Sequence, residues 1–265
     1  MYCIKKYKYM FIFDRQNIKA IYRQIREDAN IKDPQGETIL MKAAKELNLE
    51  LFNYALQHNA DINAVDMYGH NVLSKIITNF NWLPSNDSQR KSWIEATRDL
   101  IRNGIDTKIL SVYEESLFLL ACRYKCDIGL LELLVNHDNI NLKDVYQHTP
   151  LYMLCKYHNT KTVQWFLTKY KRFIDMECRP IDQTTALNIA CYVDMDLVKI
   201  LLDNGAIPAL DTNMVDHYFF RGITFINNYN RRYKLYYLYK YFRDTVRNTT
   251  KDYNVLTIIR KYIIY

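Results

Sequence analysis

Cysteine and histidine are the residues of this chain whose chemistry could support a metal site. The sequence holds six of each. No Cys-x-x-Cys pair is present, Cys122 and Cys126 lack a matching histidine pair, and Cys155 with His158 would need two further ligands. Structural zinc takes four such ligands at recognisable spacings. We therefore expect no metal and no cofactor.

Patterns that could support catalysis are equally sparse. The chain has no glycine-rich phosphate loop and no His-Glu-x-x-His, and no serine stands at a recognisable spacing from histidine and aspartate. The histidines are scattered, mostly beside turns, which favours surface or turn roles; they are His58, His70, His137, His148, His158 and His217. The sequence therefore predicts a protein that is not an enzyme.

A recurring segment must position any functional residue. Asp33-Pro-Gln-Gly36-Glu-Thr38 returns as Asp66-Met-Tyr-Gly69-His-Asn71 and, with less identity, three more times. Its last residue falls at positions 38, 71, 116, 149 and 185, with separations of 33, 45, 33 and 36. A Thr, Ser or Asn at this position can cap a helix, and the apolar residues after it predict one buried face. Each copy therefore predicts a turn followed by two helices.

The period and two local motifs carry a family resemblance. Thr149-Pro150-Leu151-Tyr152, the run from Ile200 to Ala206 and the recurring 33 together resemble the ankyrin-repeat family. The resemblance implies an all-α solenoid of helix pairs joined by finger-like turns. We predict an N-terminal helix or half-repeat over 1–32, an array over 33–210, and a basic, tyrosine-rich helical cap over 211–265. The repeats of the array are 33–65, 66–110, 111–143, 144–179 and 180–210.

Alignment of the repeats also interprets three of the six cysteines. Cys122, Cys155 and Cys191 all fall at the position that Ala44 occupies in the first repeat. That position needs a small apolar side chain, and a free thiol behaves as one. We expect these cysteines to be reduced and to pack between helices.

Three tyrosines share one position in successive repeats. Three residues before the capping position stand Gln35, Tyr68, Tyr113, Tyr146 and Asp182. In the family this position is near the finger tip, one of the places where such proteins usually contact partners. Tyrosine offers a large contact area at low entropic cost. We predict a partner-binding row at these tyrosines, with Met67 and Val145 as apolar tips; the alternative is that they pack on neighbouring fingers.

The second repeat carries about twelve extra residues, placed at 79–94. Trp82 and Trp93 in this insertion could anchor a partner. The alternative is that both tryptophans fold the insertion onto its own repeat and lengthen both helices. Both stay candidates for partner binding at this point.

Charge separates the ends of the chain from the array. Residues 1–32 hold 8 Lys/Arg and 3 Asp/Glu, residues 33–210 hold 18 and 22, and residues 211–265 hold 10 and 4. Basic residues alternate with tyrosines in 229–243, as in some binders of single-stranded nucleic acid. Leu235, Leu238 and Phe242 recur at helical spacing, which favours a cap helix. Nucleic acid and membrane are therefore disfavoured as partners.

The function expected from the resemblance is non-catalytic binding of a protein through fingers and inner helices. Two alternatives stay open: an adaptor that docks onto a larger complex such as a ubiquitin ligase through its C-terminal helices, and a binder of anionic surfaces through its basic C-terminus. The apolar stretch in residues 1–13 is too short for a signal peptide, so a cytoplasmic location is expected. Divergent ankyrin proteins rich in Lys, Asn, Ile and Tyr are frequent in intracellular bacteria and large DNA viruses, so the partner could be a host protein in the host cytosol.

Overall fold

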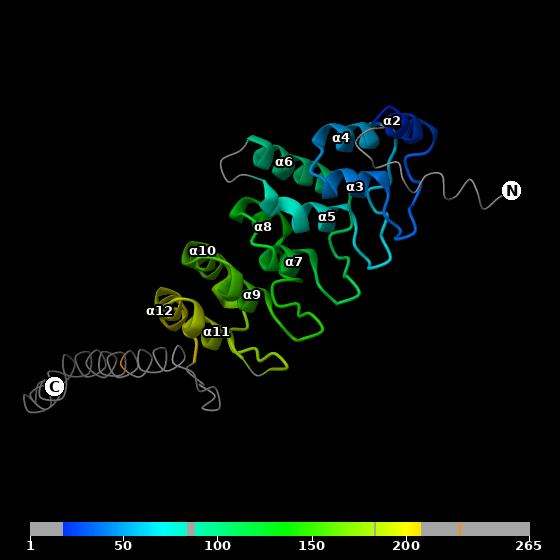
Figure 1. Cartoon of the computed structure of the whole chain (residues 1–265). Coiled ribbons are helices and arrows are strands. Elements are labelled where there is room, and N and C mark those ends of the chain that lie inside the picture. Colours follow the sequence, from blue (N-terminus) through cyan, green and yellow to red (C-terminus); the bar gives the residue numbers. More distant parts are fainter. Residues whose placement is uncertain (1–17, 84–87, 183, 208–227, 229–265) are drawn as a thin grey trace, which may run out of the picture. The chain divides into compact units, whose positions relative to one another are not determined.

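A computed structural model describes residues 18–83, 88–182, 184–207 and 228 of the chain. The chain divides into two compact units, Met1–Thr185 and Ala186–Tyr265. Within the described residues both units are built of helices and turns, and the only β-pairing is in isolated bridges such as Lys32 with Thr38 (Figure 1). The prediction of an all-α fold is confirmed.

The first helix that is described in the first unit is α2 (Ile18–Glu27), which lies where the sequence predicts the second helix of a half-repeat. Helix pairs follow in its described residues, and two short 3-10 turns, η2 (Phe80–Trp82) and η3 (Lys171–Phe173), extend two of them. The pairs are α3 (Ile39–Lys45) with α4 (Leu49–Gln57), α5 (Val72–Asn79) with α6 (Ser88–Arg102), α7 (Leu117–Arg123) with α8 (Ile128–Leu134), and α9 (Pro150–Tyr157) with α10 (Thr160–Tyr170).

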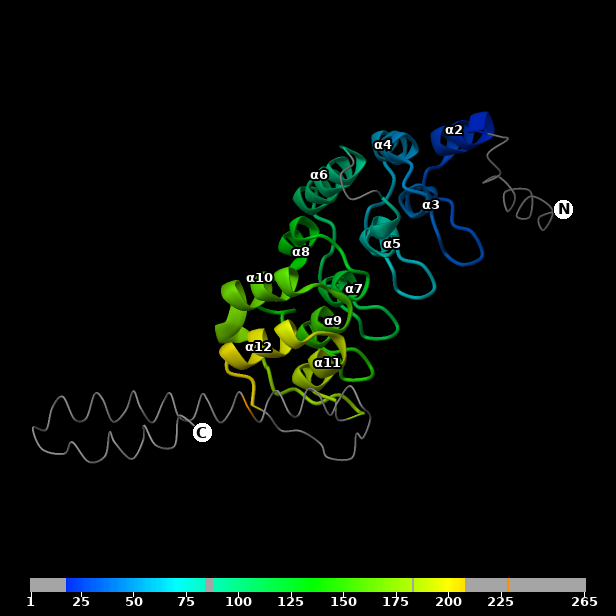
Figure 2. The ribbon, with the colours of Figure 1, turned by 60° about the vertical axis from the view of Figure 1, so that its left-hand side comes forward.

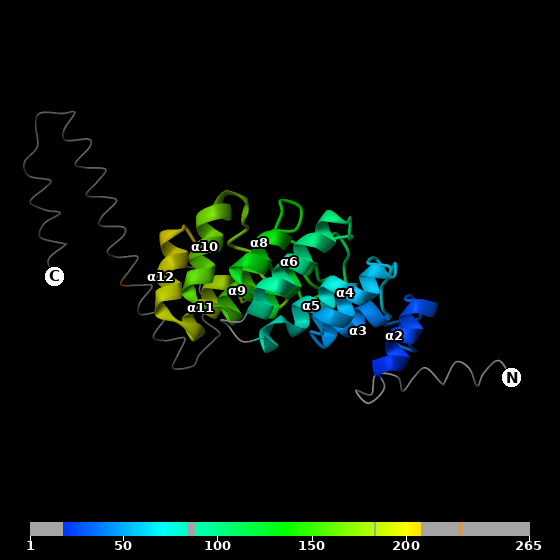
Figure 3. The same ribbon diagram turned by 90° about the horizontal axis from the view of Figure 1, so that it is seen from above.

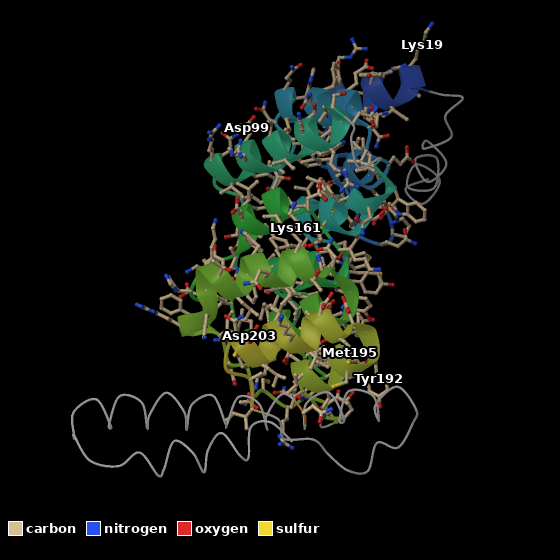
Figure 4. The ribbon with its side chains drawn as sticks, turned by 90° about the vertical axis from the view of Figure 1, so that its left-hand side faces the viewer. Lys19, Asp99, Lys161, Tyr192, Met195 and Asp203 are labelled. Atoms are coloured by element: carbon tan, nitrogen blue, oxygen red, sulfur yellow. The ribbon has the colours of Figure 1, made fainter. Side chains whose placement is uncertain are left out.

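These helices form two layers within the first unit. The first helices of the pairs, α3, α5, α7 and α9, contact one another in succession, and Figure 2 shows them as one row. The second helices, α4, α6, α8 and α10, form the other row, and Figure 3 shows from above how the pairs follow one another. Lys19, Asp99 and Lys161 project as exposed charged side chains from α2, α6 and α10 (Figure 4). The fingers leave the opposite, first-helix side.

The predicted capping residues start the first helices. The side chains of Thr38, Asn71, Ser116 and Thr149 each accept a hydrogen bond from the backbone N–H three residues on. This satisfies one of the N–H groups that a helix start otherwise leaves without a partner. The marker positions of the repeat are therefore the boundaries between finger and helix.

The core lies between the two layers. The first helices are buried almost entirely; every residue of α7 from Leu117 to Cys122 is buried. Cys122, Cys155 and Cys191 are buried and free, as predicted from their alignment with Ala44. Burial raises the pKa of all three thiols, that of Cys191 to about 11. These thiols are packing groups of low reactivity.

The insertion in the second repeat lengthens one helix. Its first residues form η2, and residues 88–94 open α6, which has 15 residues. Trp93 is 1% exposed, and its ring meets Phe52 of α4 edge-on with 5.0 Å between centroids. The prediction that Trp93 binds a partner is therefore wrong, because the side chain fills the core between two repeats. Trp82, in contrast, is 81% exposed.

His158 follows α9 and ties the fourth repeat to the third. Its Nε2 lies 2.8 Å from the carbonyl oxygen of Cys122, so Nε2 carries the proton and donates it. Burial lowers the pKa of His158 to about 4, and the hydrogen bond to Cys122 offsets only part of that effect.

A pH dependence follows from this buried histidine. Unfolding restores an ordinary histidine pKa of about 6.5, so the stabilisation is complete above that pH and is lost as pH falls towards 4. We expect the difference in unfolding free energy between the wild type and His158→Gln to be smaller at pH 4 than at pH 7, by up to about 3 kcal/mol. Urea unfolding across this range measures it. A His158 imidazole that titrates near 6.5 by NMR would contradict the burial argument.

The described part of the second unit is a helix hairpin. It comprises α11 (Ala186–Val193) and α12 (Met195–Asp203), which pack together. Asp194 caps α12 by accepting from the N–H of Asp196. Figure 4 labels Tyr192 at the end of α11 and Met195 and Asp203 at the two ends of α12.

Some predictions fall on residues that the structure does not describe. These are the N-terminal residues 1–17 and, apart from Asn228, the predicted cap over 211–265 with its basic segment 229–243. Among the helices that are described, none has the length and apolar character that crossing a bilayer requires. In the same residues, no cluster of His, Cys, Asp and Glu is arranged to hold a metal ion.

Candidate partner-binding surface

Each of the first four fingers is a tight turn held by its first residue. In the second finger, Asp66 accepts hydrogen bonds from the N–H groups of Tyr68 and His70 through Oδ1. Asp33 and Asp144 do the same in the first and fourth fingers, and Ser111 does so in the third through its hydroxyl. Side chains of this kind bond readily to the backbone two residues on. The finger conformation is therefore encoded locally.

Adjacent fingers are joined by backbone hydrogen bonds at the tyrosine position. The N–H of Val112 donates to the carbonyl of Tyr68 at 2.9 Å, and the N–H of Val145 donates to that of Tyr113 at 3.1 Å. Gln35 and Tyr146 accept in the same way from Met67 and Ile181. The backbone of the row is thus occupied by the neighbouring finger, while the side chains stay available.

The three tyrosine side chains lie on successive fingers and are 44–54% exposed. Tyr68 and Tyr146 each lie beside a histidine of their own finger. The ring centroids are 6.2 Å apart for Tyr68 and His70 and 5.8 Å apart for Tyr146 and His148. The structure therefore brings together Tyr68, Tyr113 and Tyr146 with the tip residues of the same fingers. Trp82 lies elsewhere, beyond the far end of α5.

The sequence interpretation missed two tip residues. Val112 and Ile181 occupy the position of Met67 and Val145 and are among the most exposed apolar side chains described. Only Val145 of this set is half-buried. The sequence contained this information, because the repeat alignment places Val112 and Ile181 at the same position as Met67 and Val145.

A buried ion cluster holds the first two fingers to the helices. Lys75 on α5 donates to Glu37 of the first finger at 2.5 Å and to Asp66 of the second at 2.7 Å. Burial opposes charge on both Lys75 and Asp66, but the hydrogen bonds that each of them makes outweigh it. The pKa of Asp66 is therefore lowered and that of Lys75 is raised. Lys75 fixes two fingers relative to each other.

A second ion cluster repeats this arrangement between the third and fourth fingers. Arg123 on α7 places Nη2 2.8 Å from a carboxylate oxygen of Glu115 and 2.8 Å from one of Asp144. His148 adds a contact at 3.0 Å from Nδ1 to Asp144. Burial raises the pKa of Glu115 despite the attraction of Arg123. The two clusters make the fingers a preformed surface, which lowers the entropic cost of binding.

The turn of the third finger offers a stability prediction. Glu114 replaces the glycine of the first two fingers and keeps the same left-handed backbone, with φ 59°. Removing its Cβ relieves about 1–2 kcal/mol of steric strain in this backbone conformation. Glycine loses more conformational entropy on folding, which offsets about 0.5–1 kcal/mol of that gain. We expect Glu114→Gly to stabilise the array slightly in urea unfolding.

The reverse substitution is the matched control. In Gly69→Ala the added Cβ would stand 3.1 Å from the carbonyl oxygen of Leu110, at φ +76°. This variant should be less stable than the wild type. If both variants shift the midpoint in the same direction, turn conformation does not control finger stability.

Comparison with known proteins agrees with this geometry. Residues 94–215 match the family model described as ankyrin repeats (3 copies). Two variola virus proteins named Ankyrin repeat protein OPG189 are each 24% identical over 189 residues, which is 65% of this chain and 32% of theirs. The chain spans about a third of the length of these curated relatives. The family model and these relatives both support the resemblance to ankyrin-repeat proteins that the sequence indicates.

A solved structure shows the same fold. A chain in the structure of the Bd0816 predatory endopeptidase from Bdellovibrio bacteriovorus in complex with immunity protein Bd3460 aligns with a TM-score of 0.56. The alignment covers 72% of this chain and 92% of that chain at 20% identity. Repeats of this kind generally mediate protein–protein interaction.

Proposed function

We propose that the chain binds a partner protein, without catalysis, through the finger row and the adjoining first helices. The finger row consists of Tyr68, Tyr113 and Tyr146. The observation that carries the proposal is the alignment of Tyr68, Tyr113 and Tyr146. Three half-exposed rings stand on a backbone that hydrogen bonds and buried ion pairs hold in place. Tyrosines in a rigid setting are typical of interface hot spots.

The source of the partner is part of the same proposal. Two relatives of this chain are variola virus proteins named as ankyrin repeat proteins. A viral repeat protein acts in an infected cell, so we propose a host protein in the cytosol as the partner. The adaptor and anionic-surface alternatives depend on residues 211–265, and no described residue favours them.

A matched pair of variants tests the role of the finger row. Three forms of the bait protein capture partners from host-cell lysate: wild type, Tyr68/Tyr113/Tyr146→Ala, and Tyr124/Phe173→Ala. Tyr124 and Phe173 are exposed aromatic residues outside the fingers, so the last variant controls for loss of aromatic surface. We expect the finger variant to lose a partner that the wild type and the control retain, with an affinity at least about 30-fold weaker, as for loss of 2 kcal/mol or more.

The opposite outcome is equally clear. Partners retained equally by the finger variant would show that the tyrosine row does not bind them. Circular dichroism of all three proteins must agree before the comparison counts, because each substituted side chain is exposed and should leave the fold intact.

A further inference from the structure

The fingers have a second exposed face, which shares tip residues such as Met67 with the predicted row but contains none of its three tyrosines. In an extended strand, successive side chains point to opposite sides. The first residue is buried in the second finger (Asp66) and in the third (Ser111), and the residues on either side of each are exposed. These neighbouring side chains therefore face outward. In the second finger these are Val65 and Met67, and in the third they are Leu110 and Val112.

These four side chains form an exposed apolar patch spread over two adjacent fingers. The hydrogen bond from the N–H of Val112 to the carbonyl of Tyr68 places the two fingers side by side. Val65, Met67, Leu110 and Val112 are 37–61% exposed. We call them the aliphatic finger face. Aliphatic side chains gathered on neighbouring strands at a surface mark an interaction site more often than scattered ones do.

Basic residues flank this face on both sides. The position of Val65 and Leu110 is taken by Lys32 in the first finger, Lys143 in the fourth and Arg179 in the fifth. The bridges from Lys32 to Thr38 and from Leu110 to Ser116 show that the position is structurally the same. Lys32 lies next to the patch, since its Nζ donates to the carbonyl of Val65 at 2.9 Å.

The flanking charges are not neutralised within the described residues. No carboxylate in that part of the chain lies within ion-pair distance of Lys143 or Arg179, although most of the other cations near the fingers are paired. An interface commonly has an apolar centre and a polar rim, and charge complementarity at the rim selects partners. The finger face has an apolar centre and a basic rim.

We propose that the aliphatic finger face binds a protein segment with an aliphatic centre and acidic residues on both sides. This inference rests on the proposed function, since it names the chemistry of the partner. Aliphatic side chains of the segment contact Val65, Met67, Leu110 and Val112, and its carboxylates lie near Lys32 on one side and Lys143 and Arg179 on the other.

Selection from displayed random peptides tests the proposal. The full chain is immobilised, and the probes are the enriched peptides themselves, resynthesised with a fluorescent label. We expect enrichment of an aliphatic centre between Asp or Glu residues. Met67→Ser/Val112→Ser should weaken binding of these peptides at least about tenfold, and Lys143→Glu/Arg179→Glu should shift the preference towards basic flanks. Trp82→Ser, an exposed control, should change neither.

Three results would overturn the proposal. Enriched peptides without an acidic bias would show that the basic rim does not select acidic residues. Equal binding to the wild type and to Met67→Ser/Val112→Ser would show that the aliphatic finger face does not contact the peptide. Self-association of the wild type in sedimentation, abolished by that same pair, would make the face an interface between two copies of the chain. The broader function fails separately, because it depends on Tyr68, Tyr113 and Tyr146, which this pair leaves unchanged.

Discussion

Lys75→Met should lower the free energy of unfolding by about 3–5 kcal/mol, the usual cost of removing one partner from a buried ion pair. The side chains of Lys75, Glu37 and Asp66 are 11%, 10% and 1% exposed. Without Lys75, Asp66 would remain buried without its lysine partner, and Glu37 would keep only the half-exposed Lys45 at 3.5 Å. Urea unfolding followed by circular dichroism measures the loss.

Two further variants separate charge from packing. Arg102→Met breaks an exposed pair with Asp99 and should cost less than about 1 kcal/mol. Adding Glu37→Gln and Asp66→Asn to Lys75→Met should recover much of the loss, because no charge then stays buried. Should Lys75→Met cost no more than Arg102→Met, the cluster would not hold the fingers.

The sign of the pH dependence is also fixed. The pKa of Asp66 is lowered in the folded state, so its contribution is present above the ordinary carboxyl pKa and is lost as pH falls below it. Protonation would also relieve the stranded carboxylates of Lys75→Met. The difference between wild type and variant should therefore narrow in acid.

Trp93→Ala should have an effect of similar size. It should lower the free energy of unfolding by about 3–5 kcal/mol, because it leaves a cavity and removes buried apolar surface. Trp93 is 1% exposed and joins α6 to Phe52 of the preceding pair. Trp82→Ala is the control from the same insertion, and its cost should stay within about 0.5 kcal/mol because that ring is on the surface. Urea unfolding of the two variants side by side decides the matter. Equal effects would contradict the core position of Trp93.

The positions of the finger and helix boundaries could be predicted because the chemistry there is local. Thr38, Ser116 and Thr149 cap helices through their own side chains, and Glu114 takes the left-handed turn in place of glycine. A capping group and a turn involve residues a few positions apart. A period of 33 repeats this local information along the chain.

The side-chain roles that the sequence interpretation missed depend on contacts between repeats. Lys75 reads as a solvated helix residue until Glu37, 38 positions earlier, is placed beside it. Trp93 is different, because a local signal existed: the buried residues Arg90, Trp93, Thr97 and Leu100 follow helical spacing along α6. The alternative in which the insertion lengthens the helices agrees with that periodicity, and the loop interpretation of residues 79–94 does not.

The central claim is that the finger row contacts the partner, and site-specific photo-crosslinking tests it most directly. The crosslinking amino acid p-benzoylphenylalanine is placed at Tyr113 in one protein and at Phe173 in another. Both side chains are about half exposed, and Phe173 ends η3 away from the fingers. We predict a crosslink to the captured partner from position 113 and none from position 173. A crosslink from 173 with none from 113 would contradict the account.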